Sequence, residues 1–234
     1  MSDPRNPKTG LDQSPEQDIS SPKLREERKE LGSIDNPILE SLIANLLNNA
    51  PSTQTLNLSF RTFNTDLDND EKRALYDAIS KNKSMKHLTL EAMELNDEDA
   101  KNIVTALKKR KSETGEQLTL NYLSLRMNKF TVDGTKFLAT APVDLLSMKL
   151  TKLDDNAALR FVSPEAVVPK VELNDNLLTA LGVKQLIEQN KITQKLEWDW
   201  LTTALTNPFV GDDSMKLRTE IEASRQHTTR KSTP

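Results

Sequence analysis

Two segments of the chain share one pattern of apolar and polar positions. Each begins with an apolar residue, a gap of one, Leu, a gap of two and Asn, and continues with a gap of one, an apolar residue, a gap of three, Gly, a gap of three and Leu. The pattern falls on Leu123, Leu125, Asn128, Phe130, Gly134 and Leu138, and again on Val171, Leu173, Asn176, Leu178, Gly182 and Leu186. Alternation followed by helical spacing predicts a strand, a turn and a helix in each copy.

The strand positions predict which side chains enter the core. Residues two apart on a strand point to the same face, so Leu123 and Leu125 are predicted to lie inside, while Ser124 and Arg126 face outward. The Asn of the pattern ends the strand, where its amide can satisfy unpaired backbone groups. The Gly is predicted to let the helix and strand layers approach closely.

Weaker copies of the pattern precede, separate and follow these two. We predict their strand and turn positions at Leu56, Leu58, Arg61 and Phe63; at Leu88, Leu90, Met93 and Leu95; at Met148, Leu150 and Leu153; and, for a sixth strand with a buried Trp198, at Leu196 and Trp198. Repetition at a period of roughly 20 to 30 residues, with a strand and a helix in each unit, is typical of solenoid proteins.

This pattern resembles that of the leucine-rich repeat family, in its ribonuclease-inhibitor-like branch. The resemblance implies an α/β solenoid with a curved parallel sheet, outer helices and a helical N-terminal cap. Short repeat proteins with polar ends also resemble effectors that intracellular bacteria inject into host cells. Animal ribonuclease inhibitor is rich in cysteine and this chain has none, so the resemblance is one of architecture.

The composition along the chain predicts its sections. We expect a disordered tail over residues 1–33, a capping helix over 34–52, the solenoid over 53–210, and a helix fragment followed by a disordered tail over 211–234. Asn36 and Pro37 supply a cap and a first helical residue, and the alternative role of this helix is partner binding. Trp200, Leu201, Leu205 and Phe209 are predicted to cap the C-terminal end, and disorder is expected from about Ser224.

Composition and charge exclude several classes of partner and site for this protein. The formal net charge of -3 gives no reason to expect nucleic acid or an anionic membrane as a partner. Zero cysteines exclude disulfides and thiolate metal sites. No apolar run is long enough for a membrane span or resembles a secretory signal peptide, so we expect a cytoplasmic protein, with export into a host cell as the effector alternative.

Candidate chemistry is sparse. The histidines are His87 and His227, which leave no triad or histidine metal cluster, and no glycine loop for phosphate is present. We therefore predict a protein that is not an enzyme, with no cofactor, no metal and no small-molecule substrate.

Two charged clusters have alternative interpretations. Asp66, Asp68 and Asp70 partly resemble a calcium-binding loop, but capping of the helix that follows Asp70 also explains them. The basic cluster Lys108, Lys109, Arg110 and Lys111 is interpreted as a solvated helix end, with binding of phosphate or an acidic partner as the alternative.

The outward strand positions form the candidate site. These rungs are Asn57, Ser59, Thr89, Glu91, Ser124, Arg126, Lys149, Thr151, Glu172, Asn174, Glu197 and Asp199. A protein partner is predicted to contact Tyr122, Ser124, Arg126, Lys149, Glu172, Asn174, Glu197 and Asp199, with Tyr122, beside His87, as the aromatic anchor. Charge is predicted to change from basic rungs in the middle to acidic rungs at the C-terminal end.

The predicted function is non-catalytic protein–protein interaction through this face. A GTPase-activating scaffold is the alternative, because some proteins of the repeat family stimulate GTP hydrolysis. That activity needs an Arg or Asn placed beside the nucleotide of the partner, and Arg61, in a strand-to-helix turn, is the candidate.

Overall fold

The structure, a computed structural model, describes residues 36–59 and 67–231. All of them belong to the second of the chain's two units, Ile34–Pro234. The predictions about residues 1–33, Arg61, Phe63 and Asp66 therefore lie outside the described residues.

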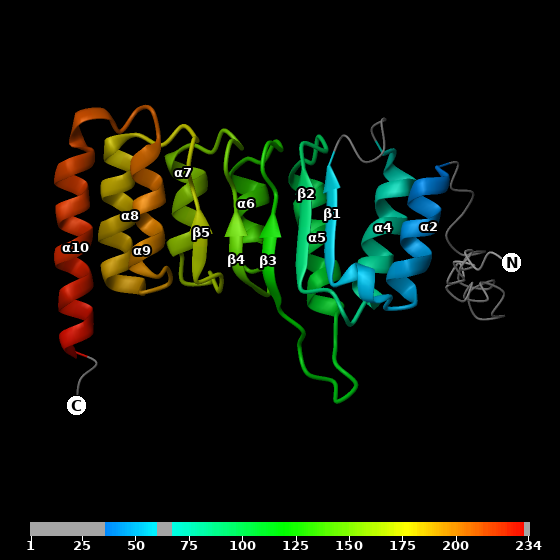
Figure 1. Ribbon diagram of the computed structural model, residues 1–234. Helices are drawn as coiled ribbons and strands as arrows, with labels where there is room; N and C mark the ends of the chain where they lie inside the picture. Colours follow the sequence, from blue (N-terminus) through cyan, green and yellow to red (C-terminus); the bar gives the residue numbers. More distant parts are fainter. Residues whose placement is uncertain (1–35, 60–66, 232–234) are drawn as a thin grey trace, which may run out of the picture. The chain divides into compact units, whose positions relative to one another are not determined.

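Five short strands form one parallel sheet, in the order β1-β2-β3-β4-β5. They are β1 (Thr55–Ser59), β2 (His87–Glu91), β3 (Leu120–Ser124), β4 (Val143–Ser147) and β5 (Lys170–Glu172). The helical segments that follow the strands are α4 (Asn69–Lys81), α5 (Asp97–Lys109), α6 (Val132–Leu138), α7 (Asp155–Ala158) with η2 (Leu159–Val162), and α8 (Ala180–Thr193). These helices lie on one side of the sheet (Figure 1), which confirms an α/β fold with a parallel sheet.

Helical segments lie at both ends of the sheet (Figure 1). α2 (Pro37–Leu47) and η1 (Pro51–Thr53) precede β1, and α9 (Trp198–Leu201), η3 (Thr202–Thr206), η4 (Gly211–Asp213) and α10 (Ser214–Lys231) follow α8. Asn36 Oδ1 accepts hydrogen bonds from N of Ile38 and Leu39, so the predicted N-cap is present. Leu39, Ile43 and Leu46 of α2 are buried, and α2 packs against α4.

The asparagines of the repeated pattern are buried and join successive repeats. Asn128 Oδ1 accepts hydrogen bonds from N of Met93 and Leu95, at 3.0 and 3.1 Å. Its Nδ2 donates to O of Leu90 and Leu125, at 2.7 and 2.9 Å. One amide thus satisfies backbone groups of its own turn and of the preceding turn, which confirms the predicted role.

Asn176 makes the same kind of contacts with the backbone of the turn that follows β4. Asn207 continues it, because its Nδ2 donates to O of Leu173 at 2.9 Å and its Oδ1 accepts from N of Asn176 at 2.5 Å. The sequence pattern did not reveal Asn207, since no strand precedes it.

The predicted sixth strand is absent from the described residues. Leu196 is buried, but Trp198 begins α9 and is half-buried. Side chains close the edge of β5 instead, since Thr203 Oγ1 accepts a hydrogen bond from N of Leu173 at 3.0 Å. Of the predicted C-terminal cap, Leu201 and Leu205 are buried, whereas Phe209 is exposed.

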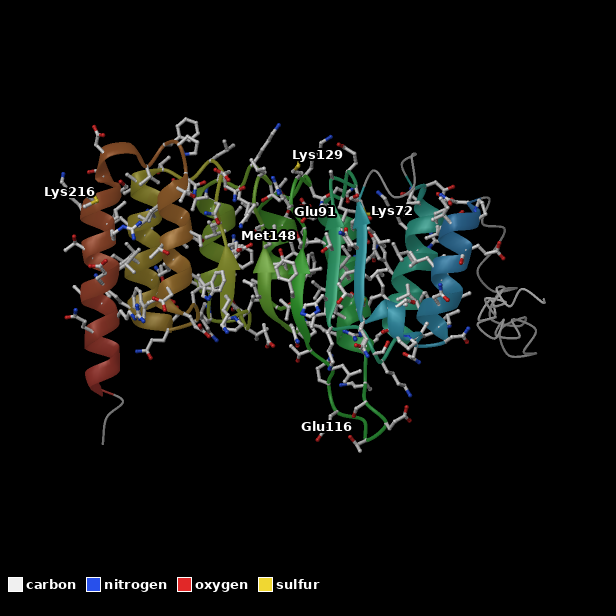
Figure 2. The ribbon with its side chains drawn as sticks, in the orientation of Figure 1. Lys72, Glu91, Glu116, Lys129, Met148 and Lys216 are labelled. Atoms are coloured by element: carbon white, nitrogen blue, oxygen red, sulfur yellow. The ribbon has the colours of Figure 1, made fainter. Side chains whose placement is uncertain are left out.

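The fourth strand was predicted in a register shifted by two residues. Leu146 pairs with Leu123 across β3 and β4, so Leu146 and Met148 take the inward positions that were assigned to Met148 and Leu150. Figure 2 labels Met148 at this strand. A shift of two residues leaves the alternation within the strand unchanged, so alternation alone could not detect it. In the turn beyond the strand the two predicted positions are exchanged, because Leu150 is exposed and Thr151 is buried.

The C-terminal helix extends further than predicted. Disorder was expected from about Ser224, yet α10 continues to Lys231. Leu217, Ile221 and Ser224 are buried at helical spacing, and α10 packs against α8, α9 and η3. Most residues of this segment are polar, and its apolar residues form only a narrow stripe, so the helix was not predicted to continue past Ser224.

Candidate functional site

The face of the sheet opposite the helices carries a row of partly exposed side chains. Strand register places Thr55, His87, Tyr122, Leu145 and Lys170 side by side on five strands. The predicted neighbours His87 and Tyr122 are therefore register partners. Leu145 completes a strip of aromatic and apolar side chains. Its place beside Tyr122 was not predicted, because the fourth strand was predicted in a register shifted by two residues.

A second row of register partners crosses the same face. It contains Asn57, Thr89, Ser124, Ser147 and Glu172. Ser124 was predicted to contact the partner, but it is fully buried and its hydroxyl donates to Oε1 of Glu91 at 2.7 Å. Figure 2 labels Glu91 on β2. Its side chain has no exposed surface for a partner to contact, so this prediction is wrong.

The remaining predicted rungs of the fourth and fifth repeats have mixed positions. Thr151 was predicted to be a rung, but it is buried in the turn after β4, where its hydroxyl donates to O of Met148 at 2.7 Å. Asn174 is half-buried, and its Nδ2 donates to Oγ1 of Thr206 at 3.1 Å. Lys149 lies in the turn after β4 and Asn174 lies in the turn after β5, so both are at the edge of the sheet face.

The predicted separation of charge along the face is wrong, because ion pairs join the acidic rungs to basic residues. These pairs are Lys149–Glu172 at 3.2 Å, Lys170–Glu197 at 3.5 Å and Arg225–Asp199 at 2.6 Å. Glu197 and Asp199 also lie at the start of α9 and not on a strand. Such partly exposed pairs stabilise a fold by about 0–1 kcal/mol each. They neutralise the acidic end of the predicted site.

Arg126 is the rung whose charge remains exposed. Among the described residues no ion pair to Arg126 is found, and this residue is exposed in the turn that follows β3. A partner group could therefore reach this guanidinium without breaking an existing ion pair.

A polar groove of about 640 Å³ lies on the other side of the molecule, between α4 and α5. At its base the hydroxyl of Tyr76 donates to Oδ1 of Asp99 at 3.0 Å, and Nζ of Lys72 lies 3.4 Å from Oδ2. Figure 2 labels Lys72. Burial raises the pKa of Tyr76, and the charge and hydrogen bond of Asp99 raise it further. Asp99 thus joins α5 to α4 through Tyr76 and Lys72. Its Oδ2 also accepts a hydrogen bond from N of Asn96 at 3.0 Å, which caps the start of α5.

The interpretation of the basic cluster as a solvated helix end is wrong for Arg110. Its side chain is fully buried and donates from Nε to O of Asn82 at 2.9 Å and from Nη2 to O of Met85 at 2.6 Å. Burial lowers the pKa of Arg110 to about 10. Lys108, Lys109 and Lys111 are exposed as expected, but Arg110 holds the end of α5 against the end of α4.

The described residues contain no group of three or more His, Cys, Asp or Glu side chains that could hold a metal ion. Asp68 Oδ1 accepts hydrogen bonds from N of Asp70 and Glu71, both at 2.8 Å, and so caps α4, which begins one residue before Asp70. Over residues 36–59 and 67–231, no helix has the length and apolar character that crossing a membrane requires.

Comparison with known proteins finds likeness only among solved structures. No protein-family model matches the sequence. No curated protein matches it either. A tropomodulin C-terminal domain from Caenorhabditis elegans is 13% identical with a TM-score of 0.42, and covers 82% of this chain and 94% of its own. Leiomodin-1 Actin-Binding Site 2 is 17% identical with a TM-score of 0.41, and covers 85% of this chain and 93% of its own.

These findings correct the family assignment. The chain was expected to belong to the ribonuclease-inhibitor-like branch, with a bacterial effector as a variant, and this assignment is wrong. Among the solved structures that the chain resembles are a tropomodulin domain and a leiomodin domain. At TM-scores of 0.42 and 0.41, the likeness carries no argument about a partner.

Proposed function

We propose that this chain is a non-catalytic protein-binding module whose partner contacts the exposed face of the parallel sheet. The observation that carries the proposal is the row that places His87, Tyr122 and Leu145 side by side, each partly exposed. Aromatic side chains supply much of the energy of protein interfaces because they bury a large area at a small entropic cost. Tyr122 lies at the centre of this row.

Arg126 supports a partner that carries an acidic group. It lies in the turn that follows β3, the strand of Tyr122, is exposed, and has no ion pair among the described residues. A carboxylate of the partner could accept paired hydrogen bonds from its guanidinium. No observation favours the GTPase-activating alternative, whose Arg61 lies outside the described residues.

The size of the face limits the strength of binding. Five strands at about 4.8 Å spacing and about 16 Å length present roughly 400 Å². A specific interface buries about 800 Å² on each partner. A partner confined to the strands should therefore bind weakly, and a stable complex requires contacts with an adjoining edge of the sheet.

Single substitutions test the proposal through the proteins that the chain captures from a lysate. Tyr122→Ala and Arg126→Glu should each lower recovery of a specific partner by about tenfold, which corresponds to about 1.4 kcal/mol. Lys149 is left unchanged because its reversal would place two carboxylates together at Glu172. The control is Lys136→Glu, an exposed cation on α6.

The readout is quantitative mass spectrometry beside a melting curve for each variant. The proposal predicts loss in both face variants, none in the control, and unchanged melting of Arg126→Glu. Equal recovery of the same proteins by all variants would show that the partner does not use this face.

A further inference from the structure

The two edges of the parallel sheet differ in their hydrogen bonding. β1 forms one edge and β5 forms the other. At the outer edge of β5, Glu197 N donates to O of Pro169 at 2.8 Å. Leu173 O accepts a hydrogen bond from Nδ2 of Asn207 at 2.9 Å, and Leu173 N donates to Oγ1 of Thr203 at 3.0 Å. The segments that follow α8 therefore satisfy backbone groups of this edge.

In the described part of the chain, nothing closes the outer edge of β1 in this way. His87 N on β2 donates to O of Gln54 at 3.0 Å, which fixes the direction of the peptide groups along β1. Because these groups alternate along a strand, the N–H and C=O groups of Thr55 and Asn57 point away from β2. Over residues 36–59 and 67–231, none of these four groups has a hydrogen-bond partner. Both residues are exposed, so another chain can reach this edge.

β1 also lacks the features that block pairing at the edge of a sheet. Edge strands of natural proteins commonly carry charged side chains or proline. The five residues of β1 include neither. Residues 36–59 contain one charged residue, Glu40, although 29% of the whole chain is charged. An uncharged end with an open strand edge, on a protein of this composition, indicates a surface that contacts another chain.

α2 exposes apolar side chains beside this edge. Its buried stripe packs against α4. Asn82 Nδ2 donates to O of Leu46 at 2.8 Å, which joins the end of α2 to the end of α4, so both helices run antiparallel to the strands. With α2 beyond α4 and behind the strands (Figure 1), a right-handed helix of this direction turns the residue before each buried one toward the strand layer. Ile38, which is 50% exposed, and Leu42, which is half-buried, therefore face that layer.

We propose that the outer edge of β1 and the side of α2 that carries Ile38 and Leu42 bind an extended, uncharged segment of a partner protein, which adds one strand to the sheet. The backbone of this segment pairs with Thr55 and Asn57. Every second side chain of the segment faces Ile38 and Leu42 and is apolar, and the others continue the exposed face of the sheet. A charged side chain facing α2 would be buried without a partner, so the uncharged surface selects an uncharged segment.

The helix layer disfavours a second copy of this chain as the occupant. Paired strands lie about 4.8 Å apart, whereas packed helices need about 8–10 Å between their axes. α2 extends past the edge of β1 (Figure 1), and a second copy would bring its own α2 to the same place. Five paired residues also bury far less than the roughly 800 Å² on each partner of a stable complex. A single extended segment brings no helix layer and covers the exposed side of α2 as well.

The test selects peptides of about ten residues from a displayed library, with the full chain as bait. In one set apolar residues alternate with Ser, Thr, Asn or Gln; in a second they alternate with Lys or Glu; in a third they follow helical spacing. Selection should enrich the first set. Asn57→Pro removes the outward N–H and leaves the ladder to β2 intact, and should lower peptide affinity at least about tenfold. Ile38→Asp should lower it by a similar factor.

Backbone pairing has a readout of its own. Synthetic copies of a selected peptide are N-methylated at every second residue, in either of the two possible phases. One phase removes the N–H groups that pair with β1 and should lower affinity at least about tenfold, whereas the other removes N–H groups that face solvent and should change it less than about threefold. Contacts through side chains alone would make the two phases equal.

Three controls separate this site from other surfaces, and a melting curve of each variant reports its folding. Asn57→Ala keeps the backbone N–H and should keep peptide affinity. Leu181→Asp matches Ile38→Asp, because each changes the second residue of a helix, and Leu181 is 66% exposed on α8. Tyr122→Ala should leave affinity unchanged, because the proposal goes beyond the sheet-face partner and does not depend on it. Failure of the edge and failure of the sheet face therefore give different results.

Several results would overturn the proposal. These are enrichment of the charged or helical sets, no enrichment, equal effects of the two methylation phases, or unchanged affinity of Ile38→Asp. Sedimentation velocity of the chain alone provides the remaining arm. Self-association of the parent that Asn57→Pro abolishes would identify a second copy as the occupant instead.

Discussion

A Cβ on Gly182 would lie 1.8 Å from Oδ1 of Asp155 in the preceding repeat. The carboxylate of Asp155 accepts hydrogen bonds from N and Oγ1 of Thr179, at 2.8 and 2.6 Å, and Thr179 caps α8. Glycine is thus required by the Asp side chain from the neighbouring helix, and not by close packing of helix against strand as predicted. The same relation joins Gly134 to Asp97, where the Cβ would lie 2.2 Å from Oδ1.

Gly182→Ala should destabilise the fold by about 1–3 kcal/mol, although alanine favours a helix by about 1 kcal/mol. The added methyl group would displace the carboxylate of Asp155 and break its hydrogen bonds to Thr179. Unfolding in urea measures the change. The matched background is Asp155→Ala, in which the methyl group meets no carboxylate and Gly182→Ala should stabilise. Destabilisation of equal size in both backgrounds would contradict the relation.

Asn176→Ala should cost about 2–4 kcal/mol, because it leaves several buried backbone groups without partners. Asn176 Oδ1 accepts from N of Thr151 and Leu153, at 3.0 and 3.1 Å, and its Nδ2 donates to O of Met148 at 2.8 Å. The control is Asn174→Ala on the same turn, which should change the free energy of unfolding by less than about 1 kcal/mol. Equal costs at both positions would contradict this role for Asn176.

We expect the free energy of unfolding to fall at alkaline pH because of Tyr76. The pKa of its hydroxyl is raised in the folded state by burial and by Asp99, above the ordinary value of 10.0. Above about pH 10 the folded state therefore binds more protons than the unfolded state, and stability falls as pH rises, by up to about 1.4 kcal/mol per pH unit. Below that pH the contribution is fully present.

Urea unfolding between about pH 8 and 11 measures this dependence, with Tyr76→Phe as the control. The variant should unfold with a shallower pH dependence at the alkaline end, and should lose about 1–2 kcal/mol at neutral pH with the hydrogen bond to Asp99. An identical alkaline slope in parent and variant would show that Tyr76 ionises as readily in the fold as in the unfolded chain.

Ile221→Ala in α10 should lower the free energy of unfolding by about 2–4 kcal/mol, since a buried branched side chain is removed. Ile221 is buried where α10 packs against the preceding helices. Met215→Ala is the control, because Met215 lies on the same helix and is exposed. Circular dichroism melting of both variants distinguishes a packed helix from a free one. Equal melting of both would show that α10 does not stabilise the unit.

The sequence by itself determined the repeated strand–turn–helix unit and the faces of β1, β2, β3 and β5. Strand alternation, helical spacing and the turn position of Asn128 and Asn176 are local properties, and a short stretch of chain is enough to express them. The neighbours His87 and Tyr122 were also found in this way, since equal repeats place equal positions side by side.

Only the tertiary structure decided the register of β4, the helix in place of a sixth strand, and the burial of Arg110. A shift of two residues leaves strand alternation unchanged, so pairing with Leu123 had to place Leu146 inside. Arg110 resembles its exposed neighbours in sequence, and the carbonyl groups that bury it belong to Asn82 and Met85 in the preceding repeat. Partners that distant are brought together by folding, and no local pattern of residues encodes them.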